Sequence, residues 1–392
     1  MIAGTTIGAG MLALPVSTGL AGFIPAAALF FAYWLFMTYT ALLFLEVNLW
    51  FPGEVNFVTM AEKTIGNWGK AFAWLFYMFL LYALTTAYIA AGGPIFIDVI
   101  DYLFGTNLPN WFGPFPLLFV FGYFVYKGTA HVDGINRLMM CGLGLSYAIV
   151  VFLLVPDIDV GYLEHVEWEY LPIGVSLAAV SFGYHIIIPS LTTYLDHDLK
   201  KLIKTLLLGS LFPLFVYLLW DFVALGTIPV EGPSSITHGY VHGISGAALL
   251  SNLSEHNQLI RFATRALSFF AIITSFLGVS LSLLDFLADG TGIEKTRSGR
   301  AFLILLTFLP PLLLALNYSR AFFSALEYAG AFGVVTLLGL LPALMVWYGR
   351  YHKGFHSDFK VPGGKCGLVI AMALSIMVVL VECGNKLGWV QV

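Results

Sequence analysis

Charged residues are scarce in this chain of 392 residues. Asp, Glu, Lys and Arg make up only 10% of it, against about 25% in a typical soluble domain. Hydrophobic residues reach 59%, so the composition excludes a soluble globular protein and indicates an integral membrane protein. The net charge is only −4 and the sequence has no basic tail or stripe, so we expect no nucleic-acid partner.

Cysteine is equally rare. Cys141, Cys366 and Cys383 have no CxxC spacing and lie in or beside apolar runs, which predicts neither a disulfide framework nor a metal site. Walker A, HExxH and other catalytic patterns are also missing, so we expect no enzymatic activity and no cofactor. The first apolar run has no basic leader and no A-x-A end, which argues against a cleaved signal peptide.

The chain does contain eleven apolar segments that are long enough, or nearly so, to cross about 30 Å of hydrocarbon. They lie near residues 2–17, 23–49, 69–91, 115–130, 136–156, 171–192, 202–224, 262–288, 301–316, 321–348 and 366–385. The longest connection, roughly 225–260, is rich in Gly, Ser and His and is predicted to be a surface loop. The predicted fold class is therefore an all-α membrane protein.

Basic residues are distributed unevenly between the connections. If the N-terminus is cytoplasmic, fourteen of the eighteen basic residues fall on the inner side. The remaining four are Arg261, Arg265, Arg320 and Lys386. The positive-inside rule therefore predicts a multi-pass protein with a cytoplasmic N-terminus and a periplasmic C-terminus.

Two of the segments are poor candidates for continuous helices. The first contains Gly4, Gly8 and Gly10 and ends at Pro15, and the sixth is interrupted by the run Ser181-Phe-Gly-Tyr-His185. Backbone that unwinds at membrane depth must line a cavity or pack on protein. A chance pairing of glycine-containing segments is the alternative, because glycine is frequent in membrane helices.

Since these segments are the first and the sixth, they run in opposite directions. That arrangement predicts two inverted five-segment repeats with one segment left over. The first repeat spans residues 1–156, the second spans 157–348, and residues 349–392 form an inner loop and the last segment.

Several stretches, in order along nearly the whole chain, carry a family resemblance. They are Ala3-Gly-Thr-Thr-Ile-Gly-Ala-Gly-Met-Leu-Ala-Leu-Pro15, Tyr39-Thr-Ala-Leu-Leu-Phe-Leu-Glu-Val47, Tyr82-Ala-Leu-Thr-Thr-Ala-Tyr-Ile-Ala90, Ser181-Phe-Gly-Tyr-His185, Thr274-Ser-Phe-Leu-Gly-Val279, Phe286-Leu-Ala-Asp289, Phe308-Leu-Pro-Pro311 and Tyr328-Ala-Gly330. Together they resemble the bacterial aromatic (hydroxy/aromatic) amino acid permeases, of which the tyrosine-specific permeases are the most similar and the tryptophan permeases next.

The resemblance implies the amino acid–polyamine–cation transporter superfamily and a LeuT-type fold with helices 1 and 6 broken. It implies uptake of tyrosine, tryptophan or phenylalanine across the bacterial inner (cytoplasmic) membrane, normally driven by protons. Crossing to mid-bilayer takes roughly 10 residues, and Gly8 has only seven before it. We therefore expect the inner half of the first segment to be short.

The resemblance places the substrate and the coupling ion beside the first break. The candidates for holding the substrate carboxylate are Thr5, Thr6, Gly8, Ala9 and Gly10. Ile7 is the candidate on this segment for binding the coupling ion. Close helix packing through small residues is the alternative explanation.

The second break is expected to receive the amino group and the aromatic ring of the substrate. Its candidates are Ser181, Phe182, Gly183, Tyr184 and His185, of which Phe182 and Tyr184 can stack on an aromatic side chain. His185 is an ionisable group within a span, which suits proton exchange near neutral pH. A neutral histidine bonded to a carbonyl is the alternative.

The third segment offers a possible side-chain pocket. Tyr82, Thr85, Thr86 and Ile89 share one helical face, and we select the first three as substrate-binding candidates. A hydroxyl there can bond a phenolic OH, which is how a site distinguishes tyrosine from phenylalanine. Hydrogen bonding between helices is the alternative.

The eighth segment carries a polar stripe formed by Ser275, Gly278, Ser282, Asp285 and Asp289. The resemblance places a cation beside its hydroxyls at Thr274 and Ser275. Asp285 is a further ion-coupling candidate, placed to accept a proton towards the cytoplasmic side. The alternative for both aspartates is pairing with one of the basic residues Lys295, Arg297 and Arg300, which we expect more of Asp289.

Three further acids lie within apolar segments, where an unpaired charge costs several kcal/mol. Glu46 and Asp221 fall near segment ends and favour structural pairing, whereas Glu327 is deeper and its role is left open. The sequence thus predicts a secondary active transporter that imports an aromatic amino acid, tyrosine before tryptophan or phenylalanine, by proton symport and alternating access. A sodium-coupled symporter and a channel are the alternatives; the expected partners are the amino acid, the ion and membrane lipid.

Overall fold

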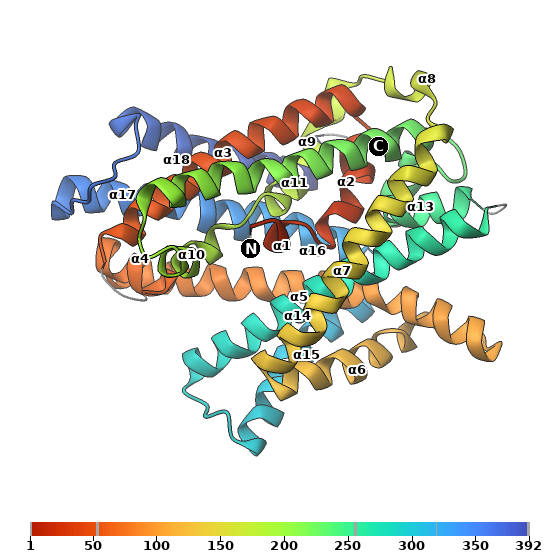
Figure 1. Cartoon of the computed structure of the whole chain (residues 1–392), viewed down its shortest axis with the longest axis horizontal. Helices are drawn as coiled ribbons and strands as arrows, with labels where there is room; N and C mark the ends of the chain where they lie inside the picture. The colour runs from red at the N-terminus through yellow and green to blue at the C-terminus, as the bar shows by residue number, and fades with distance from the viewer. Residues whose placement is uncertain (1, 52–54, 255–256, 319, 390–392) are drawn as a thin grey trace.

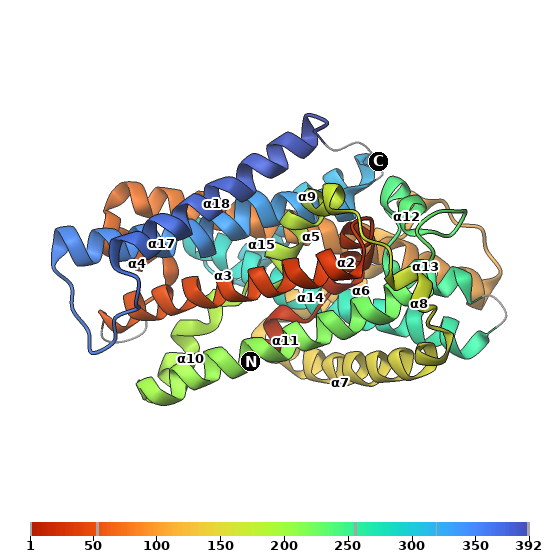
Figure 2. The same ribbon diagram turned by 90° about the horizontal axis from the view of Figure 1, so that it is seen from above.

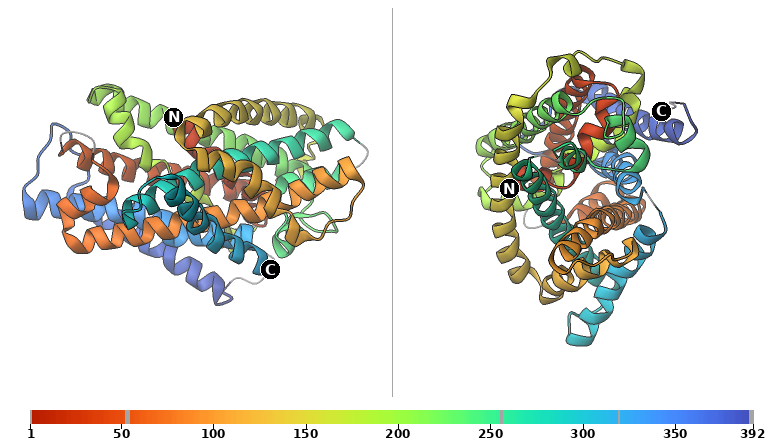
Figure 3. Two further views of the ribbon diagram at one scale, coloured as in Figure 1. Left: turned by 90° about the horizontal axis from the view of Figure 1, so that it is seen from below. Right: turned by 90° about the vertical axis from the view of Figure 1, so that its right-hand side faces the viewer.

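Long helices lying roughly side by side dominate the computed structural model, which describes residues 2–51, 55–254, 257–318 and 320–389 (Figure 1). These residues form helices and connections without a β-strand, which confirms the predicted all-α class. A helix pairs its backbone groups within one segment, as hydrocarbon requires. Helices α3, α11 and α18 follow the long axis of the molecule, and α7 crosses them obliquely in Figure 1; Figures 2 and 3 show the same bundle from other sides.

The first half of the chain, in order, consists of these helices. They are α1 (Ile2–Thr6), α2 (Gly10–Gly19), α3 (Phe23–Leu49), α4 (Phe57–Ile65), α5 (Asn67–Phe104), η1 (Asn110–Phe112), α6 (Pro114–Lys127), α7 (Thr129–Leu154), η2 (Val155–Asp157), α8 (Val160–Leu163), η3 (Trp168–Tyr170), α9 (Leu171–Ser181), η4 (His185–Ile187) and α10 (Ile188–Tyr194).

The second half continues in the same way. Its helices are α11 (Leu199–Thr227), α12 (Ile236–His242), α13 (Gly246–Leu253), α14 (Gln258–Thr291), α15 (Arg297–Asn317), α16 (Ala321–Tyr328), the π-helix η5 (Ala329–Leu340), α17 (Leu341–Tyr348), the π-helix η6 (Gly349–Lys353) and α18 (Gly364–Lys386). We call the end of the bundle that carries α4 and α10 the α4 end. The opposite end, with α8 and α13, is the α8 end (Figure 1).

Nine helical stretches in the described part of the chain are long and apolar enough to cross a membrane. The structure is therefore that of a multi-pass membrane protein, but the predicted count of eleven is not confirmed. Two expected segments are shorter. The first is split into α1 and α2, and α6 has only 14 residues because Gly128 ends it in a positive-φ conformation.

The prediction of a surface loop over residues 225–260 is wrong in part. The segment contains α12 and α13, whose N-termini are capped by the side chains of Ser235 and Ser245. Leu249 and Leu250 of α13 are fully buried, and α13 packs against α2 and α11. The Gly- and Ser-rich composition suggested a loop, but the serines act as helix caps and the leucines form a buried face.

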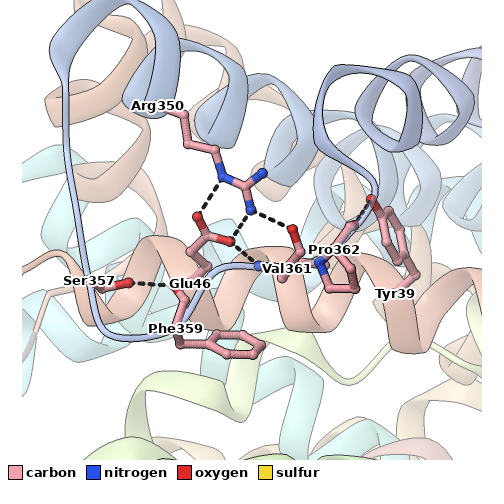
Figure 4. A network of polar contacts seen from close by, with 7 residues as sticks. All are labelled: Tyr39, Glu46, Arg350, Ser357, Phe359, Val361 and Pro362. Carbon is pink, nitrogen blue, oxygen red and sulfur yellow. Dashed lines mark hydrogen bonds and ion pairs between the residues drawn. The ribbon is translucent and has the colours of Figure 1, made fainter.

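Buried charges join helices at the α4 end. Arg350 of η6 is 5% exposed and pairs with both carboxylate oxygens of Glu46 on α3 (Figure 4). The Val361 backbone completes this network, since its N–H donates to Glu46 at 2.8 Å and its carbonyl accepts from Arg350 at 3.0 Å. The pairing expected for Glu46 is confirmed, and it ties α3 to the loop before α18.

A second charged network lies at the α8 end. Lys386 of α18 lies 2.6 Å from Glu327 of α16 and 3.4 Å from Glu382. Glu382 also accepts a 2.6 Å hydrogen bond from Ser176 of α9. Glu327, whose role the sequence left open, is thus part of an ion pair. The two networks thus hold the loop before α18 at one end of the bundle and α18 itself at the other.

The π-helix η5 approaches α9 closely at a glycine. A Cβ at Gly330 of η5 would clash with the backbone carbonyl of Ser176. The π-helical winding of this segment changes which side chains face α9 compared with an α-helix. Gly330 therefore sets the distance between η5 and α9.

We expect Gly330→Ala to push η5 and α9 apart and to destabilise the protein by about 1–3 kcal/mol, the usual cost of overpacking. Thermal unfolding of the purified protein in detergent measures this as a lowered Tm. Gly144→Ala is the control, because a Cβ there meets no atom within 4 Å. Equal Tm values for the two variants would contradict the close approach.

Candidate functional site

The two breaks predicted from the sequence are present. Residues 7–9 separate α1 from α2, and residues 182–184 separate α9 from η4 and α10. Helices α2 and α9 pack against each other, and a Cβ at Gly10 would lie 3.3 Å from the Ser181 Oγ. The structure thus brings the two interruptions together midway between the ends of the bundle, where Figure 1 shows α1.

Tyr217 of α11 bridges the two breaks. Its fully buried hydroxyl lies 2.6 Å from the carbonyl of Thr6, the last residue of α1, and 3.0 Å from that of Ser181, the last residue of α9. These carbonyls sit where their helices stop, and they need a donor because the site is buried. One side chain therefore serves both interruptions.

The same face of α11 also supports α2. Pro15 has no N–H, so the carbonyl of Met11 lacks its usual helical donor. The indole Nε1 of Trp220 donates to this carbonyl at 2.8 Å. One residue further, Asp221 Oδ2 lies 2.8 Å from the hydroxyl of Thr18 near the end of α2. Asp221 belongs to none of the ion pairs among the described residues, so the structural contact found for it is this hydroxyl and not a basic side chain.

Ser275 of α14 lies directly against the first break. Its hydroxyl accepts a 2.9 Å hydrogen bond from the backbone N–H of Ala9, and a Cβ at Gly8 would clash with the same hydroxyl. Tyr88 of α5 is buried close to Ser275. The neighbourhood expected for Ser275 is therefore present, and Gly8 lets the backbone approach it.

The aromatic residues of the second break point into protein. Phe182 packs edge-on against Tyr217, with ring centroids 5.3 Å apart. His185 is fully buried, and its Nε2 lies 2.9 Å from the Thr40 hydroxyl of α3. Tyr184 is fully buried beside it. Gly183 is half-buried against Val334 and Leu338 of η5. These residues contact α3, α11 and η5.

Other candidate residues make local hydrogen bonds. The hydroxyls of Thr6, Thr85, Thr86 and Thr274 each bond a carbonyl on their own helix. Tyr82 instead donates to the carbonyl of Leu306 on α15. In the first segment, Thr5 is exposed and Ile7 is half-buried. Their roles in binding stay predictions.

Asp285 lies away from the breaks, near the start of α15. Its carboxylate forms a 2.8 Å ion pair with Lys295, and both side chains are partly exposed. The expected pairing with a neighbouring basic residue therefore occurs at Asp285, although we expected it more of Asp289. A small cavity of about 70 Å³ adjoins this pair between α6, α7 and α14.

A larger cavity of about 490 Å³ opens at the α4 end. Asn56, Thr59 and Lys63 line it from the side of α4, and Pro189, Ser190 and Thr193 line it from α10. Because α10 follows the second break in the chain, the cavity lies on the continuation of that interrupted segment. Its lining is rich in hydroxyl and amide groups.

Sequence reasoning missed three residues of this site. Tyr217 and Trp220 lie on α11, which stays a single helix although it contains Gly209 and Pro213, and their spacing of three places them on one helical face. Pro15 was noted as a helix breaker, but the donor that its missing N–H requires was not sought. Tyr88 is three residues beyond the candidate Thr85 and follows the same face of α5.

Known proteins match this chain over almost its whole length. The family model described as "Tryptophan/tyrosine permease family" matches residues 1–382. The chain is 33% identical to "Tyrosine-specific transport system 1" of Haemophilus influenzae, over 99% of this chain and 96% of that protein. It is 31% identical to the "Tryptophan-specific transport protein" of the same organism, over 99% and 95%. It is 32% identical to the "Low affinity tryptophan permease" of Escherichia coli, over 98% and 94%.

We expect Tyr217→Phe to speed amide hydrogen exchange at both breaks, because it removes the donor shared by two buried carbonyls while keeping the packed ring. The loss of one such bond costs about 1–3 kcal/mol. Trp220→Phe should affect α2 alone. Exchange mass spectrometry reports both regions separately.

Tyr39→Phe is the matched control, since its hydroxyl bonds the carbonyl of Pro362 at the α4 end. It should leave exchange at both breaks unchanged. Faster exchange at only one break in Tyr217→Phe would show that the hydroxyl does not connect them.

Proposed function

The chain belongs to the tryptophan/tyrosine permease family, and we propose that it imports an aromatic amino acid by proton symport. Tyrosine is the favoured substrate, followed by tryptophan and phenylalanine. The family consists of transport proteins rather than enzymes. The proposed mechanism is alternating access around a site formed by the two breaks.

The observation that carries this proposal is the meeting of the breaks under one shared hydroxyl, that of Tyr217. Helix α2 begins at Gly10 without a side-chain cap, so its N-terminus carries a partial positive charge suited to a carboxylate. Helix α9 ends at Ser181 beside it, and a helix C-terminus suits an ammonium group. The pair thus complements the two charges of an amino acid backbone.

The remaining candidates take complementary roles in the proposal. Thr5, Thr6, Gly8, Ala9 and Gly10 hold the carboxylate. Ser181, Phe182, Gly183, Tyr184 and His185 receive the amino group and ring, and Tyr82, Thr85 and Thr86 line the side-chain pocket. Ile7, Thr274, Ser275 and Asp285 serve the ion. The contact of Ser275 with Ala9 supports its place in this group.

The proposed architecture has residues 1–156 and 157–348 as inverted repeats of LeuT type, and residues 349–392 as an inner loop and additional helix. Breaks in the first segment of each repeat support it. We assign the α4 end to the cytoplasm of a bacterial inner membrane, because most basic residues lie in connections at that end. The cavity between α4 and α10 is then the release route towards the cell interior.

Uptake by the purified full chain in proteoliposomes tests this function. Labelled tyrosine should accumulate when the outside is more acidic than the inside, without sodium, and a protonophore should abolish the accumulation. Competition by tryptophan and phenylalanine ranks the substrates. Accumulation that requires a sodium gradient would contradict proton coupling, and failure of all three amino acids to accumulate would contradict the proposed function.

Gly8→Ala tests where the substrate binds. The new methyl group would clash with the Ser275 hydroxyl, so we expect tyrosine affinity to fall by about tenfold or more, equivalent to about 1.4 kcal/mol. Combining it with Ser275→Ala removes the clash and should restore part of the affinity in equilibrium binding.

Gly4→Ala provides the control within the same segment, because a Cβ there meets only a Met140 methyl at 3.6 Å. It should bind tyrosine as the parent does. Unchanged affinity in Gly8→Ala would place the substrate elsewhere.

A further inference from the structure

Asp221 is a buried acid without a charged partner. It is fully buried on α11 and belongs to none of the ion pairs among the described residues. Its Oδ1 has no hydrogen-bond partner, and its Oδ2 contacts the Thr18 hydroxyl at 2.8 Å. An ionised carboxylate in such surroundings is strongly disfavoured.

The number of protons around Thr18 points to a neutral acid. Thr18 Oγ1 lies 2.8 Å from the carbonyl of Leu14 and 2.8 Å from Asp221 Oδ2, both normal O–H···O distances. A threonine hydroxyl has only one proton to donate. If Asp221 carries a proton, it donates to Thr18, and Thr18 donates to Leu14. Without that proton, Thr18 must share its one proton between the carbonyl and the carboxylate.

The surroundings of Asp221 offer no cation to replace that proton. The sequences of α1, α2 and α13, which pack against α11, contain no ionisable side chain. The Tyr147 phenol of α7 also reaches α11, where its hydroxyl donates to the carbonyl of Val216 at 2.9 Å. The other ionisable groups of the elements packed on α11 lie on α3, α7, η2 and α8.

In α3 they are Tyr33, Tyr39 and Glu46, the last bound to Arg350, and in α7 they are His131, Asp133, Arg137 and Cys141. Asp133 and Arg137 pair with each other and are exposed. Asp157 of η2 and Tyr162 of α8 are exposed at the α8 end.

Asp221 is mechanically connected to the first break. Tyr217, Trp220 and Asp221 occupy one face of α11 and contact Thr6, Met11 and Thr18 respectively. The turn of α2 that begins at Met11 lacks a backbone hydrogen bond because of Pro15. A change at the Thr18–Leu14 contact therefore acts on the weakest part of α2.

We propose that Asp221 is the group that carries the transported proton, and that its protonation tightens α2 beside the substrate site. This inference rests on the proposed proton symport and names the residue responsible. A proton from water on the α8 side forms an O–H bond on Asp221, which then donates to Thr18. After reorientation that O–H bond breaks, the proton passes to water on the α4 side, and the Thr18 hydroxyl turns to the carboxylate.

The main test compares the full chain with Asp221→Asn in proteoliposomes containing a pH-sensitive dye. The amide keeps the size of the acid and can donate to Thr18, so the variant mimics the protonated state. We expect it to bind tyrosine and to exchange labelled for unlabelled tyrosine. A gradient of about one pH unit supports about tenfold accumulation at one proton per substrate. The variant should show no accumulation and no tyrosine-induced acidification.

Asp159→Asn is the matched control, because Asp159 is an exposed acid at the α8 end that caps α8 and asparagine also caps helices well. It should accumulate tyrosine as the parent does. Proton-driven accumulation by Asp221→Asn would overturn the assignment. If the parent itself shows no proton-driven accumulation, the proposed symport fails first, and this inference falls with it.

A second pair of variants keeps the carboxyl, so the assignment stays testable if Asp221→Asn does not fold. Thr18→Val removes the hydroxyl partner and should shift the pH at which tyrosine-driven proton uptake is half-maximal. Thr18→Ser restores the hydroxyl and should restore the parent profile. Identical pH profiles for Thr18→Val and the parent would contradict a role for this contact.

Discussion

The structure depends on one requirement of the hydrocarbon environment, that no backbone polar group be left without a partner. Breaking two helices near the middle of the bundle exposes carbonyls that the helices themselves no longer satisfy. The hydroxyl of Tyr217 contacts the last carbonyl of α1 and the last carbonyl of α9. A single donor shared by two acceptors holds neither as well as a dedicated donor. Both breaks therefore depend on the same buried hydroxyl.

The charged contacts at the two ends of the bundle differ in kind from the polar contacts at the breaks between them. At the α4 end, Glu46 is neutralised by Arg350 and a backbone N–H, and at the α8 end Lys386 lies between Glu327 and Glu382. The Glu46–Arg350 pair is buried, and removing one partner of a buried pair is strongly destabilising, so it fastens α3 to η6 firmly, whereas Lys386 is 37% exposed and holds α18 to α16 less firmly. Between the two ends, the buried polar contacts at the breaks involve hydroxyls, an indole and carbonyls, which exchange partners at lower cost.

The sequence predicted the two helix breaks, because these depend on residues that are close together in the chain. Three glycines and Pro15 marked the first break, and the run from Ser181 to His185 marked the second. Sequence reasoning could not find Tyr217 or Trp220, because their importance comes from carbonyls on other segments, those of Thr6 and Met11 being 211 and 209 residues away in the chain. It also described residues 225–260 as a loop, since buried Leu249 becomes informative only once α2 and α11 are in place. The sequence pattern does not show which residues of distant segments contact one another.

A comparison of the buried acids shows why Asp221 differs from the others. Glu46, Glu327 and Glu382 each lie within reach of a cation, so each is stable as a carboxylate. Asp221 has only a hydroxyl that is also bound to the carbonyl of Leu14. A buried acid of this kind must take its own proton when no cation is near. The gain or loss of this proton changes a hydrogen bond at the end of α2, and in the proposed symport that change connects the proton gradient to the first break.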